Sequence, residues 1–199
     1  MAKGTRERIL DAALEIFSRD GYAGTNIKDI ADSVGIVKSA LYRHFESKED
    51  IFNAVLERVK VYYEERFGSV EKLPDLPRNT DELYRMTMRM VDFTIHDPKI
   101  IRMRKLLSAE QFRDERFTQL ANHYFLYDTK AIFSKVFCAL MENGAVKKND
   151  PDILALAYTA PVTALIHLCD REPEKEQEIM DQIRRFVSQF IDTYKAVSK

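Results

Sequence analysis

The spacing of apolar residues constrains this chain more than any other feature. Along nearly the whole sequence they recur at the period of a helix, and no run alternates apolar and polar residues as a half-buried strand does. The first apolar stripe consists of Ile9, Ala12, Ala13, Ile16 and Phe17. The sequence therefore predicts an all-α protein with about nine helices and no sheet.

Cap and turn residues divide this pattern into elements. Ser47 stands where it can cap a long helix, and Asp150-Pro151 reads as an N-cap followed by a first-turn proline. The stretch 68–80 holds Pro74 and Pro77, which predicts a connecting loop. Helices are expected over about 5–21, 26–33, 38–44, 48–67, 81–96, 98–112, 114–142, 151–169 and 173–196.

Composition excludes several classes of protein. The chain has 199 residues, of which 45% are hydrophobic and 32% charged, with only 6 Gly and 6 Pro. Disorder and collagen-like structure are therefore excluded, and a sizeable core can form. The formal net charge is −1. Any role in nucleic-acid binding must therefore depend on where the charges lie, not on how many there are.

Location is predicted from what surrounds the apolar segments. No apolar stretch follows the N-terminal charges, so we expect no secretory signal. The apolar stretch Ile153–Cys169 is interrupted by Pro161 and His167, which favours a buried helix over a membrane span of about 20 residues. The two cysteines form neither a disulfide framework nor a zinc spacing. We expect a cytoplasmic protein without a membrane partner.

Three residues between positions 25 and 45 have the spacing of a helix-turn-helix. Ala31 is small where two helices would touch, Gly35 suits a turn with positive φ, and Leu41 would lock the second helix onto the first. The outward side chains would then be Lys38, Ser39, Tyr42 and Arg43, which suit phosphates and base edges. Other helical hairpins share this spacing, so by itself it leaves both interpretations open.

The surrounding block decides between them. The segments ILDAALEIF, GYAGT, IKDIADSVGI and ALYRHFESKEDIF, with the long helix after them, together resemble the DNA-binding domain of the tetracycline-repressor (TetR) family of bacterial transcription regulators. The motif covers about the first quarter of the chain, and the remainder matches the family only in its helical pattern. The resemblance implies a DNA-binding domain over 1–47, a connecting helix over 48–67, and a ligand-sensing and dimerisation domain over 68–199.

The resemblance also implies particular DNA contacts. The side chains concerned are Thr25, Lys38, Ser39, Tyr42, His44 and Lys48. Thr25 would cap the second helix and bind a phosphate, while His44 and Lys48 would anchor phosphates. Arg43 lies where the family varies and is a candidate specificity residue. Val37 departs from the family, which commonly has Ser or Thr there as the N-cap, and loss of such a cap costs about 1 kcal/mol.

The middle helices are rich in methionine and aromatic residues. Most of these side chains can be explained as core, but the family resemblance implies an effector cavity between the long helix and the helices after it. Candidate lining residues are Tyr62, Met90, Phe93, Met103, Tyr124 and Tyr158. The expected effector is a small hydrophobic or amphipathic molecule.

The last two helices predict a homodimer. An apolar stripe on the final helix supplies the candidate interface residues Ile179, Ile183, Phe186 and Phe190. The helix before it is apolar on nearly all sides, so more than one of its faces must be covered. A second copy of the chain would cover one of them in a four-helix interface. The alternative is a fully internal core.

No catalytic constellation is evident in the sequence. The histidines have no carboxylate or thiol partner at the spacing of a metal site or a triad, and no glycine pattern cradles a phosphate. We therefore predict no enzyme activity, no cofactor and no metal. The chain is predicted to be a ligand-responsive regulator, most simply a repressor, that binds a palindromic double-stranded operator as a homodimer. The alternative is an all-α enzyme or a helical adaptor whose hairpin is incidental.

Overall fold

The structure is a computed structural model that describes residues 4–69, 73 and 76–196. The predicted loop over 68–80 includes residues 70–72, 74 and 75, which lie outside the described residues. The chain folds as two compact units, Met1–Arg66 with Pro98–Thr118, and Phe67–Asp97 with Gln119–Lys199. The predicted functional boundaries at 47/48 and 67/68 remain predictions, but by packing the segment 98–118 belongs with the N-terminal helices.

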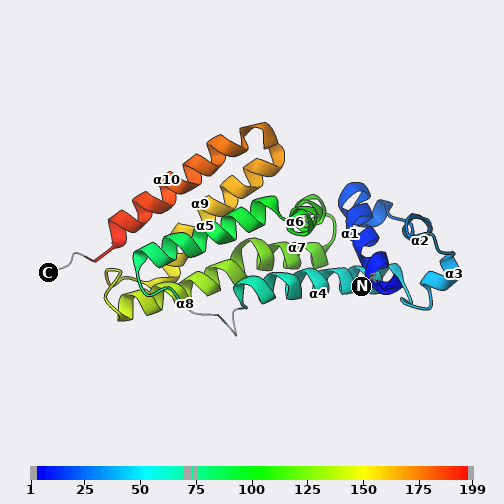
Figure 1. The fold of residues 1–199 in the computed structure, drawn as a ribbon, viewed down its shortest axis with the longest axis horizontal. Helices are drawn as coiled ribbons and strands as arrows, with labels where there is room; N and C mark the ends of the chain where they lie inside the picture. Colours follow the sequence, from blue (N-terminus) through cyan, green and yellow to red (C-terminus); the bar gives the residue numbers. More distant parts are fainter. Residues whose placement is uncertain (1–3, 70–72, 74–75, 197–199) are drawn as a thin grey trace. The chain divides into compact units, whose positions relative to one another are not determined.

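The first unit contains five helices in whole or in large part (Figure 1). They are α1 (Thr5–Gly24), α2 (Ile27–Ser33), α3 (Lys38–Leu41), α4 (Lys48–Phe67) and α6 (Pro98–Glu110). The apolar stripe of α1 forms much of its core, with Ile9, Ala13 and Phe17 each 0% exposed. Gly21, with φ of 75° and ψ of 167°, interrupts α1 near the predicted end of that helix.

Side-chain caps fix where two helices of this unit begin. The amide of Asp50 donates to Ser47 Oγ at 3.0 Å, as the sequence predicts for the start of α4. The amide of Lys28 donates to Asn26 Oδ1 at 2.9 Å, so Asn26 is the N-cap of α2. The cap predicted at Thr25 is therefore wrong by one residue.

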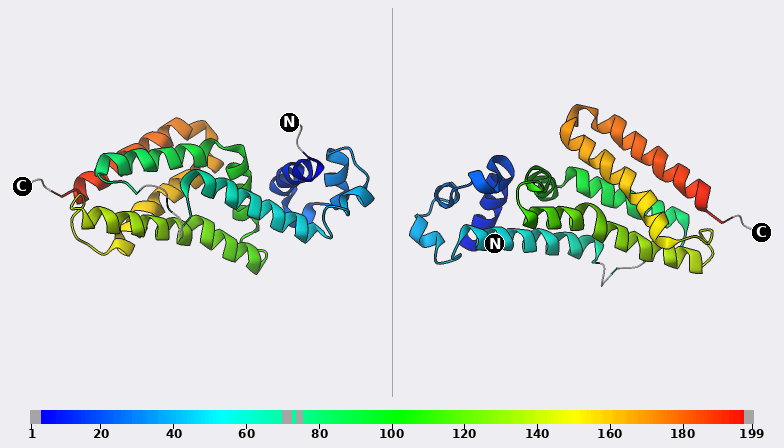
Figure 2. Two further views of the ribbon diagram at one scale, coloured as in Figure 1. Left: turned by 60° about the horizontal axis from the view of Figure 1, so that its bottom comes forward. Right: turned by 180° about the vertical axis from the view of Figure 1, so that it is seen from behind.

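The second unit is a helical bundle. Its elements are α5 (Thr80–His96), the end of α7 (Glu115–Asn122), a π-helical turn (His123–Tyr127), α8 (Asp128–Glu142), α9 (Pro151–Arg171), a short 3-10 turn (Pro173–Lys175) and α10 (Glu176–Tyr194). Asp150 caps α9 through the amides of Asp152 and Ile153, as predicted. Figure 2 shows α9 and α10 side by side and antiparallel, after the chain turns back between them.

Aromatic rings fill the centre of this bundle. The ring of Tyr158 lies 4.9 Å from that of Phe190 and 5.3 Å from that of Phe133, measured between centroids. The Tyr158 hydroxyl is 2.8 Å from Thr87 Oγ1, which satisfies both buried hydroxyls. Burial raises the pKa of Tyr158 above its ordinary value.

The all-α prediction is confirmed. Over the described ranges, the β-type pairing consists of an isolated bridge between Val146 and Lys195. The predicted single stretch 114–142 is α7, the π-helical turn and α8 in succession. By length and a mean hydropathy of 1.5, α9 could cross a membrane, but the core helices of soluble proteins pass the same test.

Candidate functional site

The two short helices of the first unit meet at the residues that the spacing singled out. Ala31 and Leu41 are both 0% exposed. Gly35 in the turn has φ of 71°, a backbone conformation that residues with a Cβ atom rarely adopt. The amide of Ile36 donates to the carbonyl of Ala31 at 3.0 Å and closes the turn. The predicted helix-turn-helix is therefore confirmed.

The second of these helices presents an exposed polar face. The exposed side chains are Lys38, Ser39, Tyr42, Arg43 and His44. Lys38 Nζ lies 5.7 Å from the centroid of the Tyr42 ring, so a cation and a flat aromatic surface lie together. The helix α3 ends at Leu41, earlier than the predicted end at His44, and the chain continues in a turn. Hydrogen-bond donors and an aromatic ring on one face suit phosphates and base edges.

Two predicted phosphate contacts have intramolecular partners. Thr25 is 3% exposed, and its hydroxyl donates to the carbonyl of Gly21 at 2.7 Å. Lys48 Nζ donates to the carbonyls of Tyr22 at 2.8 Å and Thr25 at 3.0 Å. Because an ammonium group has three hydrogens, Lys48 can secure the end of α1 and still donate to a phosphate. The phosphate roles of both residues stay predictions.

Val37 stands at the N-cap of α3 without a side-chain hydrogen bond, as its departure from the family pattern predicts. It is 68% exposed, although it is apolar and is followed directly by the exposed polar residues Lys38 and Ser39. Its backbone is extended, with φ of −75° and ψ of 151°. The start of the helix thus lies where the sequence placed it.

An aromatic cluster beneath the helix-turn-helix was not found by sequence reasoning. Tyr22 packs against Phe52 and Phe117, with ring centroids 5.1 and 5.7 Å away. Lys48 Nζ lies 4.7 Å from the Tyr22 ring, and the guanidinium of Arg116 lies 5.6 Å from it. Burial raises the pKa of Tyr22. This cluster holds α1, α4 and the start of α7 in one arrangement.

Arg116 adds charge pairing to this cluster. Its guanidinium donates to Asp114 Oδ2 and Glu49 Oε1, each at 2.7 Å. Hydrogen bonding to Asp114 raises the pKa of Arg116, and the same contact lowers the pKa of Asp114. The pattern of apolar residues carries no signal for these contacts, since all three side chains are polar.

The predicted effector residues divide between the two units. Tyr62 and Met103 belong to the first unit, and the others to the second. Met90 and Tyr158 are buried in the second unit, and Phe93 packs against Phe67 with ring centroids 5.2 Å apart. Their role in binding an effector stays a prediction.

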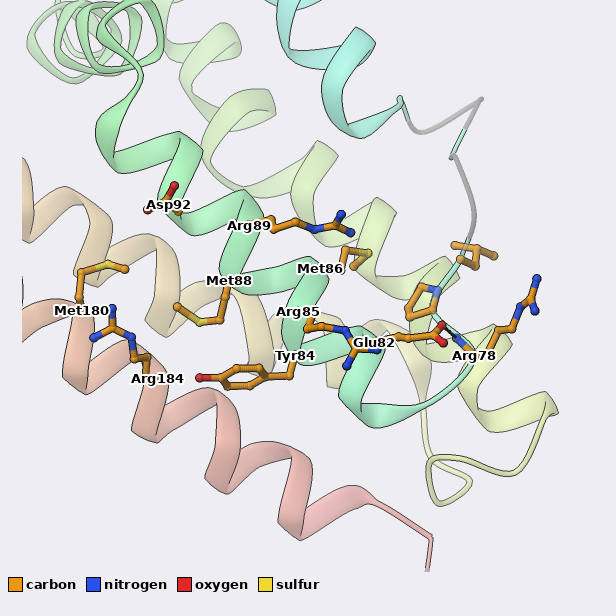
Figure 3. Close-up of a pocket in the computed structure, with 12 residues that line it drawn as sticks. Arg78, Glu82, Tyr84, Arg85, Met86, Met88, Arg89, Asp92, Met180 and Arg184 are labelled. Carbon is orange, nitrogen blue, oxygen red and sulfur yellow. Dashed lines mark hydrogen bonds between the residues drawn. The ribbon is translucent and has the colours of Figure 1, made fainter.

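The second unit carries a groove of about 770 Å³ along α5 and the start of α10 (Figure 3). Its apolar lining comes from Tyr84, Met86, Met88 and Met180, together with Leu76 and Pro77. Its charged lining comes from Arg78, Arg85, Arg89 and Arg184, with Glu82 and Asp92. None of the predicted effector residues lines this groove. The sequence could not indicate it, because α5 and α10 are almost a hundred residues apart.

The predicted interface stripe of α10 faces the chain's own core. Ile179, Ile183 and Phe190 are 1%, 0% and 8% exposed, and Phe186 is partly buried. These residues therefore offer little surface to a second copy, because α5 and α9 already cover them. The opposite side of α9 is exposed instead, at Ile153, Leu156, Ala157, Ala160 and Ala164.

His96 lies between two carboxylates of the second unit. The imidazole of His96 lies 3.0 Å from Asp92 and 3.1 Å from Glu176, so the carboxylate partners that the sequence analysis did not find are present. The hydrogen bond to Glu176, followed by the charge of Asp92, raises the pKa of His96. Over the described ranges, no group of three or more His, Cys, Asp and Glu side chains could hold a metal ion.

Two short helices that meet at the buried residues Ala31 and Leu41, with hydrogen-bond donors exposed on the second, have the geometry of a helix-turn-helix domain in an all-α protein. Residues 9–55 match the family model described as bacterial regulatory proteins, tetR family. The match covers the N-terminal domain, which resembles the DNA-binding domain of that family. The predicted family resemblance is therefore confirmed.

Curated relatives agree with this assignment. The chain is 41% identical over 56 residues to the HTH-type transcriptional regulator AcrR of Shigella flexneri, a match over 28% of this chain and 26% of AcrR. It is 40% identical over 58 residues to the negative transcriptional regulator IcaR of Staphylococcus epidermidis, over 29% of this chain and 31% of IcaR. The chain thus matches less than a third of either relative. Both are named as regulators, in agreement with the prediction that the chain is not an enzyme.

Solved structures share the fold over nearly the whole chain. The structure of SmeT, the repressor of the Stenotrophomonas maltophilia multidrug efflux pump SmeDEF, superimposes with a TM-score of 0.72 at 22% identity, over 97% of this chain and 91% of SmeT. A TetR-family regulator from Mesorhizobium loti gives a TM-score of 0.68 at 20% identity, over 96% of each chain. These likenesses establish the fold of both units.

Proposed function

We propose that this chain is a ligand-responsive repressor that binds a two-fold symmetric DNA operator as a homodimer in the bacterial cytoplasm. The observation that carries the proposal is the exposed face of α3 in a helix-turn-helix whose contact residues, Ala31 and Leu41, are buried. Lys38 and Tyr42 lie one turn apart on that face and can reach the same stretch of major groove. The names of IcaR, a negative regulator, and SmeT, a repressor, support repression.

The alternative, an enzyme or adaptor with an incidental hairpin, makes the opposite prediction about DNA. We would select sequences from a random duplex library with the purified chain, then measure the affinity for the selected duplex by mobility shift at several salt concentrations. A repressor enriches one sequence and loses affinity steeply as salt rises, because phosphate contacts release counterions. An adaptor or enzyme enriches none.

The exposed side of α9 supports the homodimer. Ile153, Leu156, Ala157, Ala160 and Ala164 form an apolar strip without a charged residue among them. Large apolar strips on a soluble chain are typical of interfaces, and the small alanines allow a second helix to approach closely. We infer that the α9 helices of two copies meet along this strip, in place of the α10 stripe that the sequence suggested.

The groove on α5 supports an effector site. Three methionines give it an adaptable apolar lining, which suits small hydrophobic or amphipathic molecules. SmeT, which shares this fold, is solved in complex with triclosan, a small aromatic molecule. We infer that an effector binds the second unit and weakens operator binding through α4. The residues of α4 up to Arg66 belong to the first unit, and its last residue, Phe67, belongs to the second.

This proposal can be tested with triclosan as the first probe. Thermal shift measurements would give its binding to the wild-type chain, to Met88→Glu in the groove, and to Met141→Glu as a control on α8. We expect Met88→Glu to abolish the shift and the control to retain it. Added triclosan should then release the selected operator, with a coupling of about 1–3 kcal/mol that is equal in both directions. A ligand that binds in the groove and leaves operator affinity unchanged would contradict the sensor role.

A further inference from the structure

Val37 combines two properties that conflict with a purely structural role. It is the N-cap of α3, and its side chain makes no capping hydrogen bond there. It is also 68% exposed, so it contributes little to the core. Valine is among the residues least suited to an N-cap, since it cannot accept a hydrogen bond from the first turn. Such local mismatches are typical of positions that serve function.

The neighbours of Val37 lie on the proposed DNA-binding face. Lys38 and Ser39 follow it directly and are exposed, and Tyr42 lies about one turn further along, 43% exposed. Since the N-terminal residues of a recognition helix approach the base edges, Val37 comes to the floor of the major groove when Lys38 and Tyr42 do. An isopropyl group has no hydrogen-bond donor, so it cannot bind a phosphate oxygen.

The major groove offers one apolar group, the C5-methyl of thymine. We infer that Val37 contacts a thymine methyl in each half-site and so selects a T·A pair at that position. The inference rests on the proposed function, because it requires the helix-turn-helix to bind an operator. It adds a residue that determines specificity through an apolar contact, where Lys38 and Tyr42 supply polar ones.

Uracil substitution provides the test, because it removes only the methyl group. The wild-type chain would first select its operator from a random duplex library. Each thymine of the selected site would then be replaced by uracil in both half-sites, and affinities would be measured by fluorescence anisotropy for wild type, Val37→Ala and Val37→Ser. Because position 37 is exposed, both variants should fold, and circular dichroism melting would check this.

We expect one thymine position at which uracil weakens wild-type binding by about tenfold over the two half-sites, as burial of one methyl group in each implies. In Val37→Ala and Val37→Ser the same replacement should change affinity less than twofold. Val61→Ala is the matched control, since Val61 is also an exposed valine, 40% exposed on α4. It should show the full wild-type effect of uracil.

The outcomes separate this inference from the proposed function. If a sequence is selected but the loss caused by uracil is the same in wild type and Val37→Ala at every position, the methyl contact is wrong while DNA binding stands. If Val37→Ser binds all sites more tightly and uracil has no effect on wild type, position 37 serves only the helix cap. If no sequence is selected, the proposed function fails, and this inference fails with it.

Discussion

Gly21 and Gly35 form a matched pair that tests how the first unit is held together. Both have positive φ, 75° at Gly21 and 71° at Gly35. They differ in what a Cβ atom would meet. At Gly21 it would lie 2.5 Å from Glu110 Oε1, whereas at Gly35 it would meet nothing within 4 Å. The side chain of Glu110 is 4% exposed, and its carboxylate accepts a hydrogen bond from Arg113. It therefore has little room to move aside.

The expected costs follow from these surroundings. Gly35→Ala places an L-residue in a left-handed conformation, which costs about 1–2 kcal/mol. The φ and ψ of Gly21 fall in a region that is nearly confined to glycine, so Gly21→Ala costs about 1–3 kcal/mol for the backbone. Displacing the buried Glu110 carboxylate from its partner adds about 1–3 kcal/mol. Gly21→Ala should therefore destabilise the chain more than Gly35→Ala.

Urea denaturation followed by circular dichroism would measure both variants. A double-mutant cycle with Glu110→Ala isolates the close contact, because without the carboxylate only the backbone cost of Gly21→Ala remains. We expect Gly21→Ala to cost about 1–3 kcal/mol less in the Glu110→Ala background. If Gly21→Ala costs no more than Gly35→Ala, or costs the same with and without Glu110, the close approach of Gly21 to Glu110 does not constrain position 21.

Three further predictions concern DNA binding, assembly and pH. Lys38→Ala and Tyr42→Ala should each weaken operator binding by about 1–3 kcal/mol in anisotropy titrations without lowering the unfolding midpoint, and wild-type affinity in both would rule out α3 as the recognition helix. Ala160→Glu should sediment as a folded monomer where wild type is a dimer; a variant that still dimerises would exclude the α9 strip. His96 has a raised pKa, so its pairing with Glu176 stabilises the fold below the unfolded pKa of about 6.5 and is lost as pH rises through the folded pKa. The stability difference between wild type and His96→Gln should therefore shrink from pH 5.5 to pH 8.5, and a constant difference would disprove this pairing.

Local features of the sequence predicted the helix-turn-helix well. Ala31, Gly35 and Leu41 lie close together in the sequence. Steric fit and backbone conformation within this short segment are enough to form the helix-turn-helix. The cap of α2 was misplaced because Thr25 and Asn26 are both good capping residues, and in the structure both have an extended backbone. The structure gives Thr25 a different acceptor, the carbonyl of Gly21.

Features that depend on distant partners could not be predicted. The stripe that contains Ile183 indicates an apolar face, but periodicity does not say whether the same chain or a second copy covers it. Likewise Arg85 of α5 and Arg184 of α10 line the same groove. Only tertiary packing brings these two helices together, so the sequence pattern does not indicate it. The contacts of Arg116 with Glu49 link polar residues that no hydrophobic pattern marks.

Methylation protection of the selected operator would show whether α3 enters the major groove, because dimethyl sulfate modifies guanine N7 there. We expect protected guanines in two half-sites whose centres lie about 34–36 Å apart on one face of the duplex. We also expect Lys38→Ala and Tyr42→Ala together to abolish this protection. Unprotected major grooves at saturating wild-type protein, or protection that persists in the double variant, would show that α3 is not the recognition helix.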